Sequence, residues 1–336
     1  MPQENTARDP GDALRRALFV LRAKMHGRAY AYRCLLEEQA TEADACAQPL
    51  TVNPRLRVQQ SAEPPDEIRQ SRLPLDAFVP EYPIAWVEDV GTRVWMPFWV
   101  PSDWAPGLLA LRPGLAAPED LSPSQRRALA MAKILVAPEY EQKRVQQWQD
   151  ICEAAQSRYG ANGYVVLHDM LHALQVRAMR RYYEMLVNGG SLPLGDTQVA
   201  DRYGLHSETL ASFFHPQLTE LVSRIAGEPV KPSYLYFASY LPGAALPKHV
   251  DREQCEFSIS LLIDYSPDPD GPCGWPLFLE HPKAPGEAIA VDLAIGDCVF
   301  YRGRELAHYR HALPPDHRST SIFFHYVRQS FAGPLA

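Results

Sequence analysis

Two histidines and an aspartate in the C-terminal third of the chain belong to the residue types that bind transition metals. His249 and Asp251 are separated by one residue, Val250. On an extended backbone, residues i and i+2 point to the same side, so both side chains would face one point. A third ligand, His308 from a distant strand, would complete a set of two histidines and one carboxylate, which holds Fe(II) and leaves coordination positions open. These residues predict a mononuclear iron site.

An arginine and a hydroxyl residue follow the second histidine at a regular interval. Arg318 lies ten residues after His308, and the Leu-Pro-Pro-Asp sequence at 313–316 is a turn signal. We therefore expect a hairpin that brings His308 and Arg318 side by side within a barrel, with Thr320 facing the same way as Arg318. A guanidinium beside a hydroxyl can hold a carboxylate by charge-assisted hydrogen bonds. The pattern predicts a small dicarboxylate that chelates the metal and reaches Arg318 at its other end.

Other histidines and arginines near these positions are either competing candidates or structural residues. His311 competes with His308, but it lies three residues later and would face the other side of a strand. We interpret His325, near the C-terminus, as a core or rim histidine. Arg310 is interpreted as an ordinary surface charge, although it could reach an acidic substrate. Arg252 directly follows the first two ligands, and it is either a substrate contact or a surface residue.

The region that contains these residues has the texture of an antiparallel β structure. From residue 234 onward, short apolar runs alternate with Pro, Gly and Asp, and no helical periodicity separates them. Such a pattern predicts a double-sheet roll or barrel with the preceding helices packed on its outside. The expected strands are Tyr234–Tyr240, Phe257–Ile263, Pro276–Leu279, Ala288–Val291, Cys298–Tyr301, Leu306–Ala312 and Ser319–Val327.

The residues before the barrel divide into a helical part and an irregular part. Helices are expected after Ser122-Pro123, which with Gln125 forms a capping box, from Pro138 to Gly160, over 171–187 and over 216–226, with a buried strand at 163–167. A first helix is expected after Asp9-Pro10. Between them, 48–121 is rich in proline, with short strands at 85–87 and 92–95. Its tryptophans form either a satellite core or a substrate wall: Trp86, Trp95, Trp99 and Trp104.

Composition limits the class of protein. The 336 residues include 31 prolines, well above the usual ~5%, and 33 basic against 40 acidic residues give a net charge of −7. The acidic balance argues against nucleic acid as a partner. Six scattered cysteines without a CxxC pair indicate reduced thiols. With no apolar leader and no run of ~18 apolar residues, we expect a cytoplasmic protein without a membrane span.

The ordered set of motifs resembles the Fe(II)/2-oxoglutarate-dependent dioxygenases, and within them the prolyl-hydroxylase-like branch. The resemblance covers roughly residues 140–330 and rests on Tyr240-Leu241-Pro242-Gly243, His249-Val250-Asp251, Gly296-Asp297, His308 and Arg318. It implies an α+β fold with a double-stranded β-helix core of the jelly-roll, cupin-like type. The expected division is an N-terminal helical and irregular extension at 1–135, with a possible dimer surface, and a dioxygenase domain at 136–330, its helices at 138–227 and its barrel at 234–327.

The same resemblance implies the chemistry. His249, Asp251 and His308 would bind Fe(II), and Arg318, Thr320 and Tyr240 would bind 2-oxoglutarate. With O2, such an enzyme hydroxylates an unactivated C–H bond of a small molecule, amino acid or peptide and releases succinate and CO2; desaturation, epoxidation or ring closure would use the same oxidant. One departure is Leu246, where a second tyrosine is expected. A cupin-like metalloenzyme without 2-oxoglutarate and a non-catalytic binding barrel remain alternatives, and an outward-facing Arg318 would favour the first of them.

Overall fold

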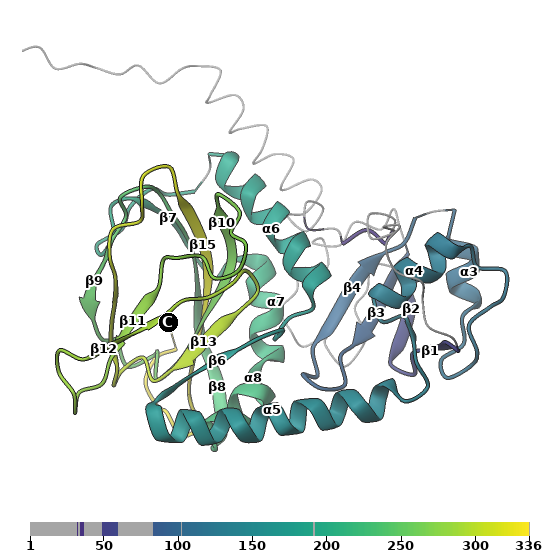
Figure 1. The fold of residues 1–336 in the computed structure, drawn as a ribbon, viewed down its shortest axis with the longest axis horizontal. Coiled ribbons are helices and arrows are strands. Elements are labelled where there is room, and N and C mark those ends of the chain that lie inside the picture. Colours follow the sequence, from purple (N-terminus) through teal and green to yellow (C-terminus); the bar gives the residue numbers. More distant parts are fainter. Residues whose placement is uncertain are drawn as a thin grey trace, which may run out of the picture.

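The computed structural model describes residues 32, 34–36, 49–59, 83–101, 103–190 and 192–335. Its C-terminal half contains two antiparallel sheets that face each other (Figure 1). The large sheet consists, in spatial order, of β6 (Tyr164–Leu167), β13 (Cys298–Tyr301), β10 (Phe257–Ser266), β15 (Arg318–Arg328), β8 (Val230–Tyr240) and β7 (Arg202–His206). The small sheet consists of β12 (Ala288–Val291), β11 (Leu277–Glu280), β14 (Ala307–Arg310) and β9 (Leu246–His249).

The order in which the chain visits the two sheets defines the architecture. From β8 to β11 successive strands alternate between the large and the small sheet, and β12 to β15 again run small, large, small, large. A core between the sheets is built from both of them, including Tyr240 and Leu262 of the large sheet and Leu277 and Leu279 of the small one. This is the predicted double-stranded β-helix with flanking helices, and the prediction of the α+β fold is confirmed.

Helices cover the outer face of the large sheet (Figure 1). They are α5 (Tyr140–Asn162), α6 (Ala173–Asn188), α7 (Thr209–Gln217) and α8 (Thr219–Ala226). On α6, the buried residues recur at helical spacing, and Tyr183 stacks on Phe237 of β8 with ring centroids 4.7 Å apart. Tyr159 of α5 stacks on Phe300 of β13 at 4.6 Å. These contacts fix the large sheet from behind and leave its other face to the barrel interior.

The end of α5 differs from the prediction that Gly160 would stop it. The helix continues through Gly160 and ends before Gly163, whose φ of +76° is the left-handed conformation that caps helices. The predicted helix at 216–226 is in the structure two helices, α7 and α8. The strand β7, at 202–206, was not predicted and lies inside the segment that we expected to be helical.

The N-terminal part of the described chain contains small sheets as well as loops. A three-stranded sheet is formed by β2 (Leu56–Gln59), β3 (Ile84–Glu88) and β4 (Trp95–Trp99), and β1 (Thr51–Val52) pairs with β5 (Leu135–Val136). Two helices, α3 (Ala105–Ala110) and α4 (Pro123–Met131), complete it, and Ser122 and Gln125 form the predicted capping box. The strand predicted at 92–95 lies at 95–99 instead. Of the named strands β4 pairs with β3 alone, and its other edge, which is bridged at Trp99 by Leu35, tolerates Pro97.

The tryptophans of this segment belong to the core. Trp86 and Trp99 are fully buried, and the Trp86 ring meets Phe213 of α7 at 6.1 Å. These rings do not line the cavity described below, and they are part of the core that continues under the helices and the large sheet rather than of a separate satellite core. The helix expected after Asp9-Pro10 lies outside the described residues. The five described cysteines are buried and form no disulfide with one another, and none of the described helices has the length and apolar character needed to cross a membrane.

Candidate metal centre

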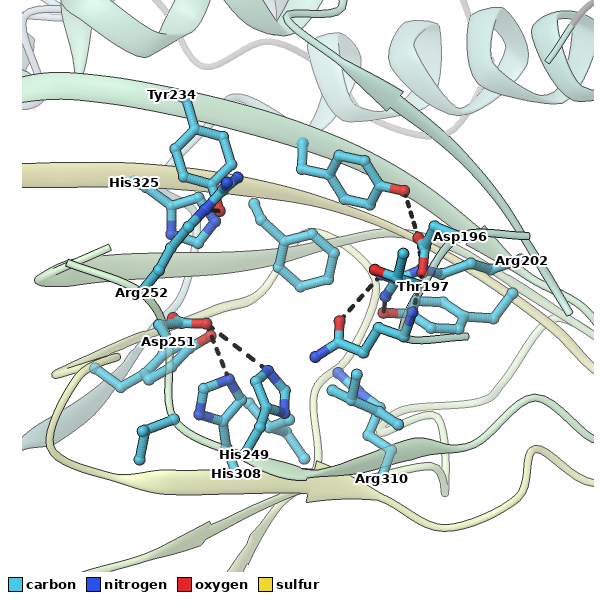
Figure 2. Close-up of a pocket in the computed structure, with 18 of the residues that line it drawn as sticks. Asp196, Thr197, Arg202, Tyr234, His249, Asp251, Arg252, His308, Arg310 and His325 are labelled. Atoms are coloured by element: carbon cyan, nitrogen blue, oxygen red, sulfur yellow. Dashed lines mark hydrogen bonds and ion pairs between the residues drawn. The ribbon is translucent and has the colours of Figure 1, made fainter. Parts of the chain in front are cut away.

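The two predicted histidines meet across neighbouring strands of the small sheet. His249 ends β9, and His308 of β14 is its direct partner in the antiparallel register. Their ring centroids are 4.2 Å apart, and Asp251, two residues after His249, lies beside both rings (Figure 2). The Oδ1 atom of Asp251 is 3.5 Å from Nε2 of His308 and 3.8 Å from Nε2 of His249. The structure therefore brings together the three side chains that the sequence spacing selected.

Hydrogen bonds orient the two imidazole rings. The Nδ1 atom of His249 is 2.8 Å from the carbonyl of Pro247, and Nδ1 of His308 is 3.0 Å from the carbonyl of Leu306. Because a carbonyl oxygen only accepts, each Nδ1 carries a hydrogen, and the lone pair of each neutral ring is on Nε2. Both Nε2 atoms are the ones that approach Asp251. This orientation is the one in which metal-binding histidines are held by backbone carbonyls.

The pKa shifts of His249 and Asp251 favour the forms of these side chains that bind a metal cation. Burial lowers the pKa of His249, and the neighbouring His308 lowers it further, so that the ring is neutral at neutral pH. Burial raises the pKa of Asp251, but its interactions with His308 outweigh this and the net shift is downward. A carboxylate between two imidazoles whose Nε2 atoms face it is the donor set expected for a divalent transition metal.

A glycine leaves the space that the carboxylate occupies. The carbonyl of Gly303 accepts the backbone N–H of Asp251 at 2.8 Å. A Cβ atom at residue 303 would lie 2.2 Å from Oδ2 of Asp251 and 2.6 Å from both the carbonyl of Cys255 and Oγ of Ser258. Real side chains do not approach so closely, and all three of these neighbours are held in hydrogen bonds. Only glycine at this position lets the ligand loop close on the small sheet.

The metal centre opens into a cavity of about 540 Å³ between the two sheets. Figure 2 shows the candidate ligands at one end of this cavity and Arg310 and Arg202 at the other. The aromatic side chains of its wall come from the large sheet: Tyr234, Tyr236, Tyr240, Tyr301 and Phe323. The volume exceeds that of a single five-carbon diacid, so that there is space for a second molecule.

Arg310 carries a buried charge. It is 5% exposed, its guanidinium donates to the carbonyl of Trp275, and it lies over the Trp275 ring at 4.5 Å. Among the described residues, no carboxylate forms an ion pair with it. Burial lowers the pKa of Arg310, which expresses the cost of keeping this cation out of water. A buried cation that faces a cavity and has no direct ion-pair partner among the described residues is suited to bind an anion.

Tyr240 and Arg202 lie next to this cation. Arg202 forms an ion pair with Asp196, with 2.7 Å between Nε and Oδ2, and donates from Nη1 to the hydroxyl of Tyr240 at 3.1 Å. Because the Tyr240 oxygen accepts that bond, its own proton is available to a ligand in the cavity. Tyr240 is thus in the cavity, as the resemblance implied. Tyr236 also donates to Asp196, at 2.8 Å, and fixes the loop that carries this carboxylate.

Arg318 and Thr320 are not where the sequence analysis expected them. Arg318 is exposed at the start of β15 and is absent from the cavity wall. Thr320 is buried, and its hydroxyl donates to Ser239 at 3.0 Å on the opposite face of the large sheet. The cause is strand parity, because the inward-facing residues of β15 are Phe323 and His325, and even-numbered residues of this strand face the helices. The predicted positions of both side chains are therefore corrected.

Arg310 was not predicted as a cavity residue, although the sequence contains a pattern that indicates its position. Arg310 lies two residues after His308, and the same i, i+2 rule that paired His249 with Asp251 would have placed it inside the barrel. Arg202 and Asp196 had no such signal, since β7 was not foreseen. His311 is exposed and contacts Phe278 on the outer side of the small sheet, in agreement with the preference for His308.

Comparisons with known proteins give structural similarity alone. No family model and no curated protein matches the chain. Solved structures that are similar include a Pseudomonas putida prolyl-4-hydroxylase (18% identity, 53% of this chain and 100% of that one, TM-score 0.44). A second is a Trichoplax adhaerens prolyl hydroxylase in complex with a peptide fragment of a hypoxia inducible factor (12% identity, 54% of this chain and 91% of that one, TM-score 0.45). A third is the alpha ketoglutarate dependent epimerase SnoN from nogalamycin biosynthesis (20% identity, 54% of this chain and 84% of that one, TM-score 0.42). These similarities cover about half of this chain, and its chemistry depends on its own residues.

Proposed function

We propose that this protein is an Fe(II)- and 2-oxoglutarate-dependent oxygenase. One observation carries the proposal: two imidazoles and a carboxylate, from His249, His308 and Asp251, converge at one end of a cavity whose other end holds the buried cation of Arg310. The three side chains would bind the metal through both Nε2 atoms and Oδ1. A ligand set of two histidines and one carboxylate would leave coordination positions for a chelating ligand and O2.

The groups at the far end of the cavity fit the second carboxylate of a diacid. Arg310 supplies the charge, and Tyr240 supplies a hydroxyl proton that Arg202 leaves free. Ser319 lies directly opposite Tyr240 in the sheet register, and its buried hydroxyl has no hydrogen-bond partner among the described residues. A carboxylate in this position would pair with Arg310 and accept a hydrogen bond from Tyr240, whereas Ser319 is not part of the cavity wall. We infer that Arg310 takes the role that the sequence analysis assigned to Arg318.

The chemistry of the bound groups and the role of the chain are distinct. When bound, a ferrous ion with 2-oxoglutarate and O2 supplies the oxidant that removes hydrogen from an unactivated C–H bond, with release of succinate and CO2. The chain holds the ligand set on two paired strands and excludes water with the aromatic wall. It orients the diacid between the metal end and Arg310.

The primary substrate would enter beside the metal ligands. Tyr234, Arg252 and the half-exposed Val250 surround this side of the cavity (Figure 2). The Arg252 guanidinium lies 4.4 Å over the Tyr234 ring. This side of the cavity therefore offers a substrate both a planar cation and an aromatic edge. Such a rim suits a small molecule, an amino acid or a short peptide, with hydroxylation as the proposed outcome.

An outward-facing Arg318 favours a second candidate, a cupin-like metalloenzyme that does not use 2-oxoglutarate. The exposure of Arg318 is the observation in its favour, and the buried Arg310 is the observation against it. A barrel that only binds ligands has less support, because the three candidate metal ligands are all present.

Anaerobic addition of Fe(II) and then 2-oxoglutarate to the purified protein tests the proposal. We expect a weak visible charge-transfer band that needs both additions, and its loss in His249→Ala. Binding of Fe(II) without any band or change on addition of 2-oxoglutarate would support the cupin-like alternative. Failure to bind Fe(II) at all would contradict both.

A further inference from the structure

A chain of hydrogen bonds links the cavity wall to the candidate ligand Asp251. Nδ1 of His325 is 2.9 Å from Oγ of Ser258, and this hydroxyl is 3.0 Å from Oδ2 of Asp251. Ser258 is completely buried on β10, and His325, on the adjacent strand β15, is 5% exposed and lines the cavity. Neither residue is a metal ligand in the proposed function, and the sequence analysis interpreted His325 as a core or rim residue.

The direction of these bonds follows from the donors available. A carboxylate accepts only, so the single hydroxyl proton of Ser258 is donated to Oδ2 of Asp251. The competing acceptor, the carbonyl of Cys255, is 3.4 Å away and therefore a weaker partner. Since Ser258 has no second proton, Nδ1 of His325 must be the donor to its oxygen. The order of donation is thus from His325 to Ser258 to Asp251.

We propose that His325, acting through Ser258, positions Asp251 as a metal ligand. The relay occupies Oδ2 and turns Oδ1 toward the two histidine Nε2 atoms, at 3.5 and 3.8 Å. Without a donor at residue 325, the Ser258 hydroxyl could rotate toward the Cys255 carbonyl, and both carboxylate oxygens would compete for the metal. His325 is a positioning residue in this scheme, and the inference rests on the metal site of the proposed function.

The ring of His325 is itself held in place. It stacks on Tyr234 with centroids 4.5 Å apart and planes at 29°, and its backbone carbonyl is 2.9 Å from Nε2 of the buried His215. Tyr234 carries Arg252 on its ring at the substrate side. A purely structural role for His325 would depend on this stacking, whereas the relay depends on the N–H at Nδ1.

Two substitutions separate these roles. The amide nitrogen of His325→Asn takes about the place of Nδ1 and keeps a donor, but it removes the ring. His325→Phe keeps the stacked ring and removes the donor. We expect Co(II) affinity, titrated on the metal-free full chain by the visible absorption of the ion, to fall about 10–100-fold in His325→Phe and to stay within a few-fold of wild type in His325→Asn. Ser258→Ala should lose as much as His325→Phe, and the double variant should lose no more than either.

The measurements either support or overturn the role of His325 in positioning Asp251. The thermal unfolding midpoint of the metal-free variants shows that they fold, and Ser258→Ala provides the same test if His325→Phe does not. Retained affinity in His325→Phe with loss in His325→Asn would mean packing alone and would overturn the relay. Loss of a second Co(II) equivalent in both variants would make His325 a ligand, with Cys255 and Asp251 nearby, and would also overturn it. Absence of Co(II) binding by the wild type would instead remove the metal site on which both proposals rest.

Discussion

Arg310 follows His308 by two residues on β14, and both side chains face the same cavity. Along a strand, this interval spans about 6.6 Å. One short strand therefore supplies a candidate metal ligand and a buried cation to the same cavity. The small sheet thus provides both ends of the proposed 2-oxoglutarate site, and the large sheet contributes the hydroxyl of Tyr240.

Replacement of Arg310 by glutamine should weaken 2-oxoglutarate binding selectively. A hydrogen bond to a charged group contributes about 1.5–3 kcal/mol, which corresponds to roughly a 10–100-fold rise in the 2-oxoglutarate concentration needed for half-maximal succinate release. The metal-free protein should not lose stability, because the variant removes a buried cation that has no ion-pair partner among the described residues. Succinate release and the thermal shift induced by 2-oxoglutarate measure the two effects.

Arg318→Gln is the matched control. Its side chain is exposed on the far side of the strand, so we expect the 2-oxoglutarate requirement to stay at the wild-type value. A requirement that rises in Arg318→Gln and not in Arg310→Gln would reverse the assignment and restore the anchor expected from the ten-residue interval.

The contrast between these arginines shows what the sequence could determine. The i, i+2 spacing of His249 and Asp251 is short enough to fix relative orientation, and the structure agrees with it. The interval from His308 to Arg318 crosses a turn, and a shift of one residue in register moves every side chain of a strand to the other face. Spacing across a turn therefore predicted the hairpin but not the face on which Arg318 lies.

The strands also divide into those that the sequence predicted and those that it did not. Strands bounded by Pro, Gly and Asp were predicted within a few residues in the barrel, whereas β7 and β9 were missed there, as were β1, β2 and β5 in the N-terminal part. In β7, Gly204 interrupts the apolar pattern, and its reason is tertiary: a Cβ there would lie 1.8 Å from the Tyr236 hydroxyl, which crosses it to reach Asp196. In β9, Pro247 and the exposed Lys248 conceal a strand that is recognised only by its pairing with β14.

Substitution of Gly303 by alanine should weaken metal binding. The added Cβ would lie 2.2 Å from Oδ2 of Asp251, and relief of this contact requires displacement of the ligand or of the loop at Cys255. We expect a loss of Co(II) affinity of at least about tenfold together with a lower thermal midpoint, since overpacking typically costs about 1–3 kcal/mol. Wild-type affinity in Gly303→Ala would contradict the ligand geometry described here.

Gly107→Ala controls for the general effect of replacing a glycine. Gly107 lies in α3, its backbone has no positive φ, and a Cβ there would meet no atom within 4 Å. The change should leave Co(II) affinity unaltered and should be neutral or stabilising by up to about 1 kcal/mol.

Stability should fall below neutral pH, and His172 should account for part of the fall. Its Nδ1 accepts the N–H of Leu174 as the N-cap of α6, and burial lowers its pKa to about 4. The unfolded chain, with a histidine pKa near ~6.5, binds this proton more readily, so the free energy of unfolding decreases as the pH falls from about 6.5 to about 4, by roughly 2 kcal/mol between pH 7 and 5. Asparagine caps helices without titrating, so His172→Asn should keep the stability at pH 7 and lose this part of the slope, whereas His172→Ala should lose the slope and about 1 kcal/mol at pH 7. Chemical unfolding of the metal-free chain from pH 7 to 5 measures both quantities, and an unchanged slope in His172→Asn would show that the cap does not titrate in this range.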